Sequence, residues 1–469
     1  MHASQSSASD REIQARGERE QGTEGKEEEW SKDLQAGPGR GVPEFSTKKE
    51  SLIATLLFVL ILSGPPRFRI RDFDASLRGE LDWVVLLNIA VWALAGLWVL
   101  RQIGNRFYAR QRLVHMRLPQ ILGIVMIVCL TASIWRSPAP ELTAFKIYQM
   151  ATTLFFVQIF TEHLGAKKTL NAMLWGNMLL CLAIAACASF APSMVWTSSD
   201  FNPEPSRLRG ELIASTGVVS TLAIILLVSK ARTIWRPGTL LLLALPFGLL
   251  VLSLERTAYV VMFAFLVLIF LKRPSAKAIL QFAGLVCALG LALYAYHLLP
   301  SLSHYRDPQD IAGLNDRVGL WTFLTKVTLK RSPWFGLGYY SASRVYGTDY
   351  NPGLGTAHSM FFEVLLGGGV VSFVLLVALC CAMGIFAMRA LWVRKDRLTF
   401  ATVSLFIACV LFGSMGDVID SGPVAIGFWF AATALPWLST PSMRKFPAPR
   451  AAHDPLPAGA AAAAAVQES

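Results

Sequence analysis

The sequence is poor in charged residues. Asp, Glu, Lys and Arg make up 16% of its 469 residues, whereas about 25% is usual in soluble proteins. Nineteen of the 74 charged residues lie in the first 50 positions, so the rest of the chain is poorer still. Hydrophobic residues reach 54%, which is more than one core of this size can bury. These values exclude a soluble Rossmann, barrel or sandwich enzyme and require a surface that faces lipid.

The chain also lacks the usual patterns of metal, disulfide and nucleic-acid sites. Its seven cysteines all fall in apolar runs without a CxxC pair, so we expect neither a disulfide framework nor a zinc site. The single Asp-x-Asp motif, Asp72-Phe73-Asp74, is interpreted as a solvated loop. The net charge of +12 comes from short basic clusters between apolar runs. A protein that binds nucleic acid instead has its Lys and Arg residues on one continuous face. We therefore expect no metal, no cofactor and no nucleic-acid partner.

Apolar runs predict an all-α polytopic membrane protein with about 12 transmembrane helices in a core at 49–439. Such runs approach the ~20 residues that span a bilayer as a helix. They begin near Ser51, Trp83, Leu118, Phe145, Leu170, Leu212, Thr239, Thr257, Ala278, Ser359, Leu398 and Gly422. Residues 1–48, rich in Glu, Gln, Ser and Gly, and residues 440–469, with an alanine run, predict disordered tails. The first of these has no signal-peptide pattern.

Basic residues alternate between the predicted loops. The loops after spans two, four, six, eight and ten carry 17 Lys and Arg against two acids. The loops on the other side carry acids and bases in nearly equal number. Because cytoplasmic loops are enriched in Lys and Arg, the pattern predicts that both termini are cytoplasmic. The long loop 300–357, between spans nine and ten, is then external.

The long external loop is where function is expected, because a 58-residue insertion among short connections needs a reason. Asn315 or Asp316 is expected to cap a helix that lies on the membrane surface. Its predicted apolar face consists of Val318, Trp321, Leu324, Val327 and Thr328. Residues 332–340 predict an aromatic turn with glycines, and His358 ends the loop. The next span contains a predicted helix break at 367–369.

Three external sites combine charge with membrane depth, where a charge usually has a function. They are Arg207 with Arg209, Glu255 with Arg256, and His358 with Ser359 and Glu363. Each also has a structural interpretation. Arg207 would be an interfacial anchor, Arg209 a partner of Glu211, Arg256 a partner of Glu255 or of helix carbonyls, and His358 a helix cap. His297 and His304 have no comparable setting and are interpreted as structural.

Several of these motifs occur in a familiar order. Arg209-Gly210 precedes a span, Leu254 to Ala258 form a turn, and residues 315–321, 332–338 and 357–359 follow with a glycine-rich break. In this order the chain resembles the O-antigen ligase and polymerase superfamily of bacterial envelope glycosyltransferases, and most of all its ligases. His358, Ser359 and Gly369 match the family's histidine pattern, whereas Ser372 departs from it. Of the family's Ser-Arg-Gly turn only Arg256 carries over.

The resemblance implies an inverting, metal-independent transfer of polysaccharide from undecaprenyl diphosphate to a lipid A-core sugar hydroxyl, at the periplasmic face of the inner membrane. His358 would be catalytic, because histidine is the commonest general base. The donor diphosphate would be bound by Arg207, Arg209 and Arg256, since developing negative charge needs positive partners. Ser359, Glu363, Arg317 and Trp321 would support the site.

Alternatives within the same superfamily are an O-antigen polymerase and a protein O-oligosaccharyltransferase. A ligase is favoured because one long loop directly precedes the histidine span while the other external loops are short. A polysaccharide flippase is a further alternative from another class. It is less favoured, because the chain shows neither internal repeats nor polar residues near the midplane.

Overall fold

The structure is a computed structural model that describes residues 48–63, 82–108, 116–197, 207–210, 213–231, 236–272, 317–350, 356–416 and 419–440. Several predictions lie outside these residues: both predicted tails but for their innermost residues, the span near Ala278, and the loop positions 300–316 and 351–355. The expected helix cap at Asn315 or Asp316, His297, His304 and Glu211 also lie outside the described residues, as does the side chain of Arg207.

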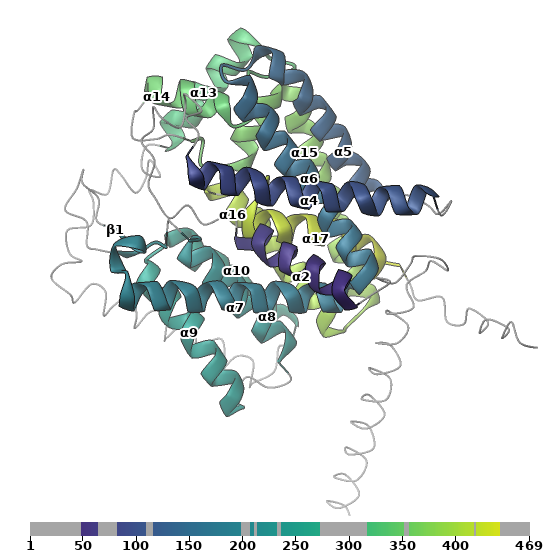
Figure 1. Cartoon of the computed structure of the whole chain (residues 1–469), viewed down its shortest axis with the longest axis vertical. Helices are drawn as coiled ribbons and strands as arrows, with labels where there is room; N and C mark the ends of the chain where they lie inside the picture. The colour runs from purple at the N-terminus through teal and green to yellow at the C-terminus, as the bar shows by residue number, and fades with distance from the viewer. Residues whose placement is uncertain are drawn as a thin grey trace, which may run out of the picture.

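The described chain is almost entirely helical (Figure 1). Two short 3-10 helices, η1 (Ala132–Arg136) and η2 (Pro192–Met194), and a two-residue antiparallel pair of strands, β1 (Trp196–Thr197) and β2 (Arg207–Leu208), complete it. The helices are α2 (Lys48–Ser63), α4 (Trp83–Tyr108), α5 (Leu118–Thr131), α6 (Pro140–Leu164), α7 (Ala166–Phe190), α8 (Thr216–Lys230), α9 (Pro237–Ser253), α10 (Arg256–Lys272), α13 (Arg317–Arg331), α14 (Ser341–Tyr350), α15 (Met360–Val393), α16 (Arg397–Met415) and α17 (Gly422–Leu438).

The chain is a polytopic membrane protein. Within the described residues, five helical stretches are long and apolar enough to cross a bilayer: α4, α5 continued by η1, α7, α15 and α16. The helices α2, α8, α9 and α17 are shorter but also apolar. Every predicted apolar run is helical here, apart from the run near Ala278, which is not among the described residues. The count of twelve spans and their orientation stay predictions.

The helices pack around a large apolar core. The helix α15 lies along α5, α16 packs against α17 and α8, and α8 also contacts α7 and α9. Large buried side chains fill the bundle, among them Trp92, Phe156 and Trp429. Phe58 of α2 stacks on Phe160 of α6 with ring centroids 4.5 Å apart. Close-packed interiors tolerate little movement of their side chains. These contacts therefore hold helices that are distant in sequence in fixed relative positions.

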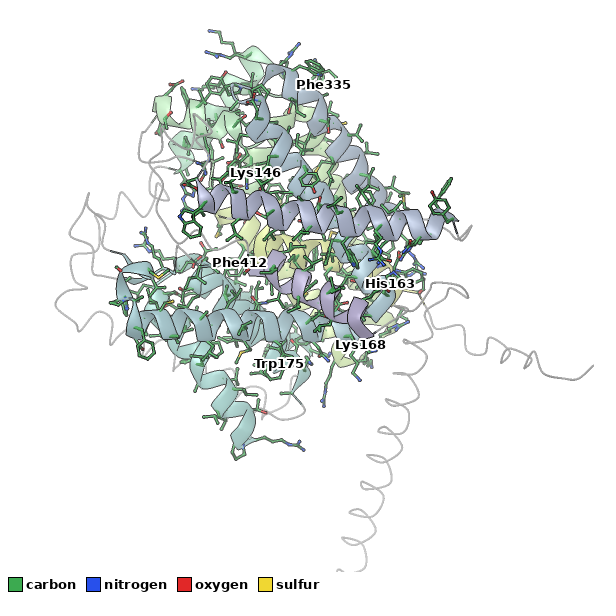
Figure 2. All side chains as sticks on the ribbon, viewed as in Figure 1. Lys146, His163, Lys168, Trp175, Phe335 and Phe412 are labelled. Atoms are coloured by element: carbon green, nitrogen blue, oxygen red, sulfur yellow. The ribbon has the colours of Figure 1, made fainter. Side chains whose placement is uncertain are left out.

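The helix α6 runs from one polar end of the bundle to the other. Lys146 lies near its start and His163 near its end (Figure 2). Its 25 residues correspond to about 37 Å at the usual helical rise. At the His163 end, Arg106 forms a buried ion pair with Glu162 at 2.6 Å, and Lys168 lies in the first turn of α7, which follows. The start of α6 instead contacts the segment that follows α13.

The segment 317–350 forms a small layer on the bundle, with α13 and α14 next to each other against α15 (Figure 1). The prediction of a helix here is confirmed, but its predicted buried face is partly wrong. Val318 is 46% exposed, and Leu320 is buried in its place, together with Leu324 and Thr328. The reason is that α13 packs on α14 and α15, so Leu320 and Leu324 join a separate apolar cluster with Leu337 and Leu366.

The predicted helix break at 367–369 and the predicted aromatic turn at 332–340 are joined by backbone hydrogen bonds. Gly369 has φ +68°, which interrupts α15. The backbone N–H of Leu337 donates to the carbonyl of Leu366 at 2.8 Å, and that of Val370 donates to Pro333 at 2.7 Å. A Cβ atom at Gly336 would overlap the carbonyl of Gly367. The two segments approach this closely because glycine lacks a side chain, and the start of α15 is thereby fixed.

Candidate functional site

The backbone around Arg209 is fixed by hydrogen bonds. The N–H groups of Arg209 and Gly210 both donate to the carbonyl of Val195, at 2.9 and 3.0 Å, and the N–H of Thr216 donates to the carbonyl of Arg209 at 3.0 Å. Gly210 has φ +66°, and a Cβ atom there would overlap the carbonyl of Ala214. Only glycine fits such a turn readily. These bonds therefore hold the backbone of Arg209 against the first residue of α8.

The turn between α9 and α10 brings Glu255 to the beginning of α8. Leu254 ends α9 in a left-handed conformation with φ 52°. The hydroxyl of Ser215 donates to the Glu255 carboxylate at 2.9 Å, and the N–H of Gly217 is a second donor. A Cβ atom at Gly217 would overlap this carboxylate. Glu255 therefore occupies the N-terminus of α8, where unpaired N–H groups and the helix dipole favour negative charge.

Two arginines from separate segments face Glu255. Burial raises the pKa of Glu255, while its hydrogen bonds and the positive charges of Arg209 and Arg317 oppose the rise. Arg317 is the first residue of α13, and its guanidinium also donates to the carbonyl of Met415 at the end of α16. Burial lowers the pKa of Arg317, and the charge of Glu255 counteracts this. The turns before α8 and α10 and the first residue of α13 thus meet at one carboxylate.

His358 lies directly before α15 in a strained conformation. Its φ is 49°, and a left-handed residue other than glycine costs about 1–3 kcal/mol. The backbone of the preceding residue, Ala357, is held at both its N–H and its carbonyl. The indole N–H of Trp321 donates to the carbonyl of Ala357 at 2.7 Å, and the N–H of Ala357 donates to Glu363 at 2.9 Å. Trp321 also stacks on Phe362 with centroids 4.7 Å apart. We call Trp321, Ala357 and Glu363 the Ala357 clamp.

The imidazole of His358 is neutral at neutral pH. Burial lowers its pKa from the usual 6.5 to about 4, and the positive charge of Arg317 adds to this effect. A neutral imidazole keeps one nitrogen lone pair that accepts a proton. Arg317 therefore links His358 electrostatically to Glu255 and, through it, to Arg209.

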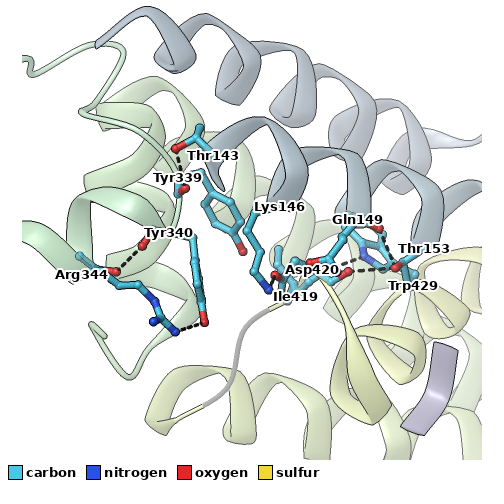
Figure 3. A network of polar contacts seen from close by, with 11 residues as sticks. Thr143, Lys146, Gln149, Thr153, Tyr339, Tyr340, Arg344, Ile419, Asp420 and Trp429 are labelled. Carbon is cyan, nitrogen blue, oxygen red and sulfur yellow. Dashed lines mark hydrogen bonds and ion pairs between the residues drawn. The ribbon is translucent and has the colours of Figure 1, made fainter. Parts of the chain in front are cut away.

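A second polar network joins α6 to the segment around Tyr340 and to Asp420, before α17 (Figure 3). Lys146 of α6 forms an ion pair with the fully buried Asp420 at 2.7 Å, and its Nζ lies 4.4 Å from the centre of the Tyr340 ring. Arg344 donates to the Tyr340 hydroxyl at 2.6 Å. The charges of Glu363 and Asp420 both act on Arg344. The network therefore continues from the clamp to the start of α6.

Sequence reasoning missed this second network. Lys146 lies in the apolar run that begins near Phe145, and Asp420 lies just before the run that begins near Gly422. The available signal was a lysine inside a predicted span, which usually has a buried partner. The partner itself is 274 positions away in the chain, so only the fold identifies it.

The predicted site residues are brought together in part. Arg209 and Arg317 both act electrostatically on Glu255, and Arg317 also acts on His358. Trp321 and Glu363 hold the Ala357 peptide, and Ser359 is the N-cap residue of α15. Arg256 begins α10, directly after Glu255. Arg207 pairs with Thr197 through its backbone. Among the described residues, no three His, Cys, Asp or Glu side chains are grouped as metal ligands.

One comparison with known proteins bears on this site. Residues 239–377 match the family model described as O-antigen ligase. The matched stretch runs from α9 into α15 and includes Glu255, Arg317 and His358, whereas Arg209 precedes it. The match confirms the resemblance inferred from the motif order. No curated protein matches the chain.

Proposed function

We propose that this chain, which carries an O-antigen ligase family domain at 239–377, is an O-antigen ligase. It transfers a polysaccharide from undecaprenyl diphosphate to a sugar hydroxyl of lipid A-core, on the periplasmic side of the bacterial inner membrane. The observation that supports the proposal is that Arg317 stands between two groups from distant segments: it faces Glu255 together with Arg209, and its charge also acts on His358.

In this proposal the arginines bind the donor. Breaking the bond between sugar and diphosphate leaves negative charge on phosphate oxygens, which positive groups stabilise in the transition state. A guanidinium presents paired N–H donors that suit phosphate oxygens. Arg209, Arg256 and Arg317 supply this charge around the turn before α10, and Arg207 contributes from β2. Arg317 thereby has a larger role than the supporting one expected from the sequence.

His358 acts on the acceptor. Its neutral ring takes the proton of the attacking sugar hydroxyl. The hydroxyl oxygen forms a bond to the anomeric carbon, and the electron pair of the breaking bond leaves with the undecaprenyl diphosphate. A single displacement of this kind inverts the anomeric centre. The Ala357 clamp keeps His358 in its strained position, because an unconstrained backbone would relax to ordinary φ values.

The proposed orientation puts both termini in the cytoplasm and segment 317–350 in the periplasm. A cysteine at the exposed position Asp349, in a Cys-free background, should react with an impermeant thiol reagent in spheroplasts. A cysteine at the exposed position Lys395 should not react until the membrane is permeabilised. The opposite labelling pattern would reverse the orientation and remove the site from the periplasm.

The reaction itself is tested with purified protein, a lipid-linked polysaccharide donor and lipid A-core in excess EDTA. We expect capped lipid A-core and free undecaprenyl diphosphate as products. Deleting the gene should leave lipid A-core without polymer while carrier-linked polymer accumulates. Core carrying one repeat unit would identify a polymerase instead, and loss of carrier-linked polymer from the periplasm would identify a transporter. Loss of activity in EDTA with rescue by a divalent ion would contradict the metal-free site.

A further inference from the structure

Glu255 is an unexpected residue for a site that binds a diphosphate. Its carboxylate accepts hydrogen bonds from the Ser215 hydroxyl and the Gly217 N–H, and it faces Arg209 and Arg317. The proposed function gives these arginines to the donor. A negative side chain among them repels a negatively charged substrate, yet the fold makes room for it by having glycine at position 217.

The groups around Glu255 are those that bind phosphate oxygens. Hydroxyl and N–H donors at the first turn of a helix bind phosphate in many proteins, and guanidinium groups add charge and paired hydrogen bonds. Here the helix is α8, which has 15 residues, and the two guanidiniums come from outside it. In the structure, therefore, a carboxylate of the chain itself occupies a position whose donors suit one phosphate group.

We propose that Glu255 is an internal anion that occupies a donor phosphate position and competes with the donor for Arg209 and Arg317. The inference rests on the proposed function, because it assigns these arginines to the donor. Without donor, Glu255 supplies counter-charge to the arginines and keeps them in place. When donor binds, a phosphate takes over these contacts and the carboxylate moves away or is protonated.

Competition by a carboxylate depends on pH. The charged groups that face Glu255 are Arg209 from the turn before α8 and Arg317 from α13, with Arg256 next in the chain and His358 beyond Arg317. The arginines stay charged at any ordinary pH. Burial raises the pKa of Glu255 above its usual value, so acidification protonates it and weakens the competition. Glu255→Gln removes the charge while keeping the shape and an acceptor oxygen for Ser215.

The experiment measures binding of inorganic pyrophosphate to the purified full chain in detergent by calorimetry. Glu255→Gln should bind pyrophosphate about tenfold more tightly than wild type, within the usual range of coupling between sites. Without pyrophosphate, the Glu255→Gln variant should have a lower melting temperature than wild type, because the arginines lose their internal counter-charge. Pyrophosphate should raise the melting temperature of this variant more than that of wild type. Glu141→Gln, the same change at an exposed position on the first turn of α6, should behave as wild type. Glu255→Ser provides a second variant without the carboxylate.

The pH dependence provides a second readout. As the pH is lowered through the raised pKa of the Glu255 carboxyl, the affinity ratio of Glu255→Gln to wild type should fall toward one. Equal or weaker pyrophosphate binding by both Glu255 variants, with wild-type folding retained, would overturn the inference. Tighter binding by these variants with no glycan transfer by wild type would leave the inference standing and refute the proposed function.

Discussion

Trp321→Phe tests whether the Ala357 clamp positions His358. The substitution removes the indole N–H, which donates to the Ala357 carbonyl at 2.7 Å. It keeps an aromatic ring in the stack on Phe362, where the centroids lie 4.7 Å apart. The remaining half of the clamp, the bond from the Ala357 N–H to Glu363, is not altered. The change therefore isolates one hydrogen bond next to His358.

The expected size of the effect on the transfer rate follows from the burial of Ala357 and the backbone strain at His358. Ala357 is fully buried, and a buried carbonyl left without a partner costs about 1–3 kcal/mol. The left-handed conformation of His358 stores about 1–3 kcal/mol that the clamp must counteract. We expect about 1–2 kcal/mol of this free energy to raise the activation barrier, because His358 is no longer held in place. The transfer rate then falls roughly 5- to 30-fold, since about 1.4 kcal/mol is a factor of ten in rate.

The assay compares initial transfer rates with donor affinity. Trp321→Phe should lower the transfer rate. The donor affinity should stay within about twofold of wild type, which is well below the factor of ten that about 1.4 kcal/mol produces, because the arginines are unchanged. Trp334→Phe is the matched control, since that side chain is 62% exposed. A wild-type rate in Trp321→Phe, or an equal loss in both variants, would show that the clamp does not position His358.

Three further predictions concern other parts of the site. Gly369→Ala should destabilise the protein by about 2 kcal/mol or more, because φ is +68° and a Cβ would overlap Trp334, whereas Gly384→Ala in the same helix has nothing within 4 Å and should not lower the melting temperature. Lys146→Met should cost about 3 kcal/mol by leaving Asp420 buried without a partner, and adding Asp420→Asn should restore part of the loss; additive losses would contradict this. Because burial lowers the pKa of His358 to about 4, kcat/KM should fall only as pH approaches about 4, and an acid limb near the usual 6.5 would contradict the lowered pKa of this base.

Much of the fold was predictable from the sequence, because lipid imposes a strong pattern. Hydrocarbon requires long apolar helices, and runs such as those from Trp83 and Leu118 correspond to α4 and α5. The break in α15 was also predictable, since three consecutive glycines interrupt a helix easily. The face of α13 was not, because apolar spacing alone did not distinguish Val318 from Leu320. Packing against α14 and α15 decided it.

The candidate site was predictable as a set of residues but not as an arrangement. Charges at membrane depth identified Arg209, Arg256 and His358 from the sequence. Glu255 lies at the start of α8, and Arg317 lies between Glu255 and His358. Both positions depend on interactions between residues that are 40 to 62 positions apart. No local pattern encodes such contacts. The ion pair of Lys146 with Asp420 joins residues 274 positions apart and is not predictable for the same reason.

The most direct test of the proposed mechanism is glycan transfer by His358→Ala, measured together with donor binding. Loss of a general base costs about 10²–10⁴ in rate, whereas loss of a helix cap costs about 1 kcal/mol of stability. His358→Asn serves as a second variant, because asparagine tolerates the left-handed conformation of this residue. Both variants should fold, melt near wild type and bind donor, with transfer reduced about 10²-fold or more. Wild-type transfer by either variant, or transfer lost only with the fold, would contradict the catalytic role of His358.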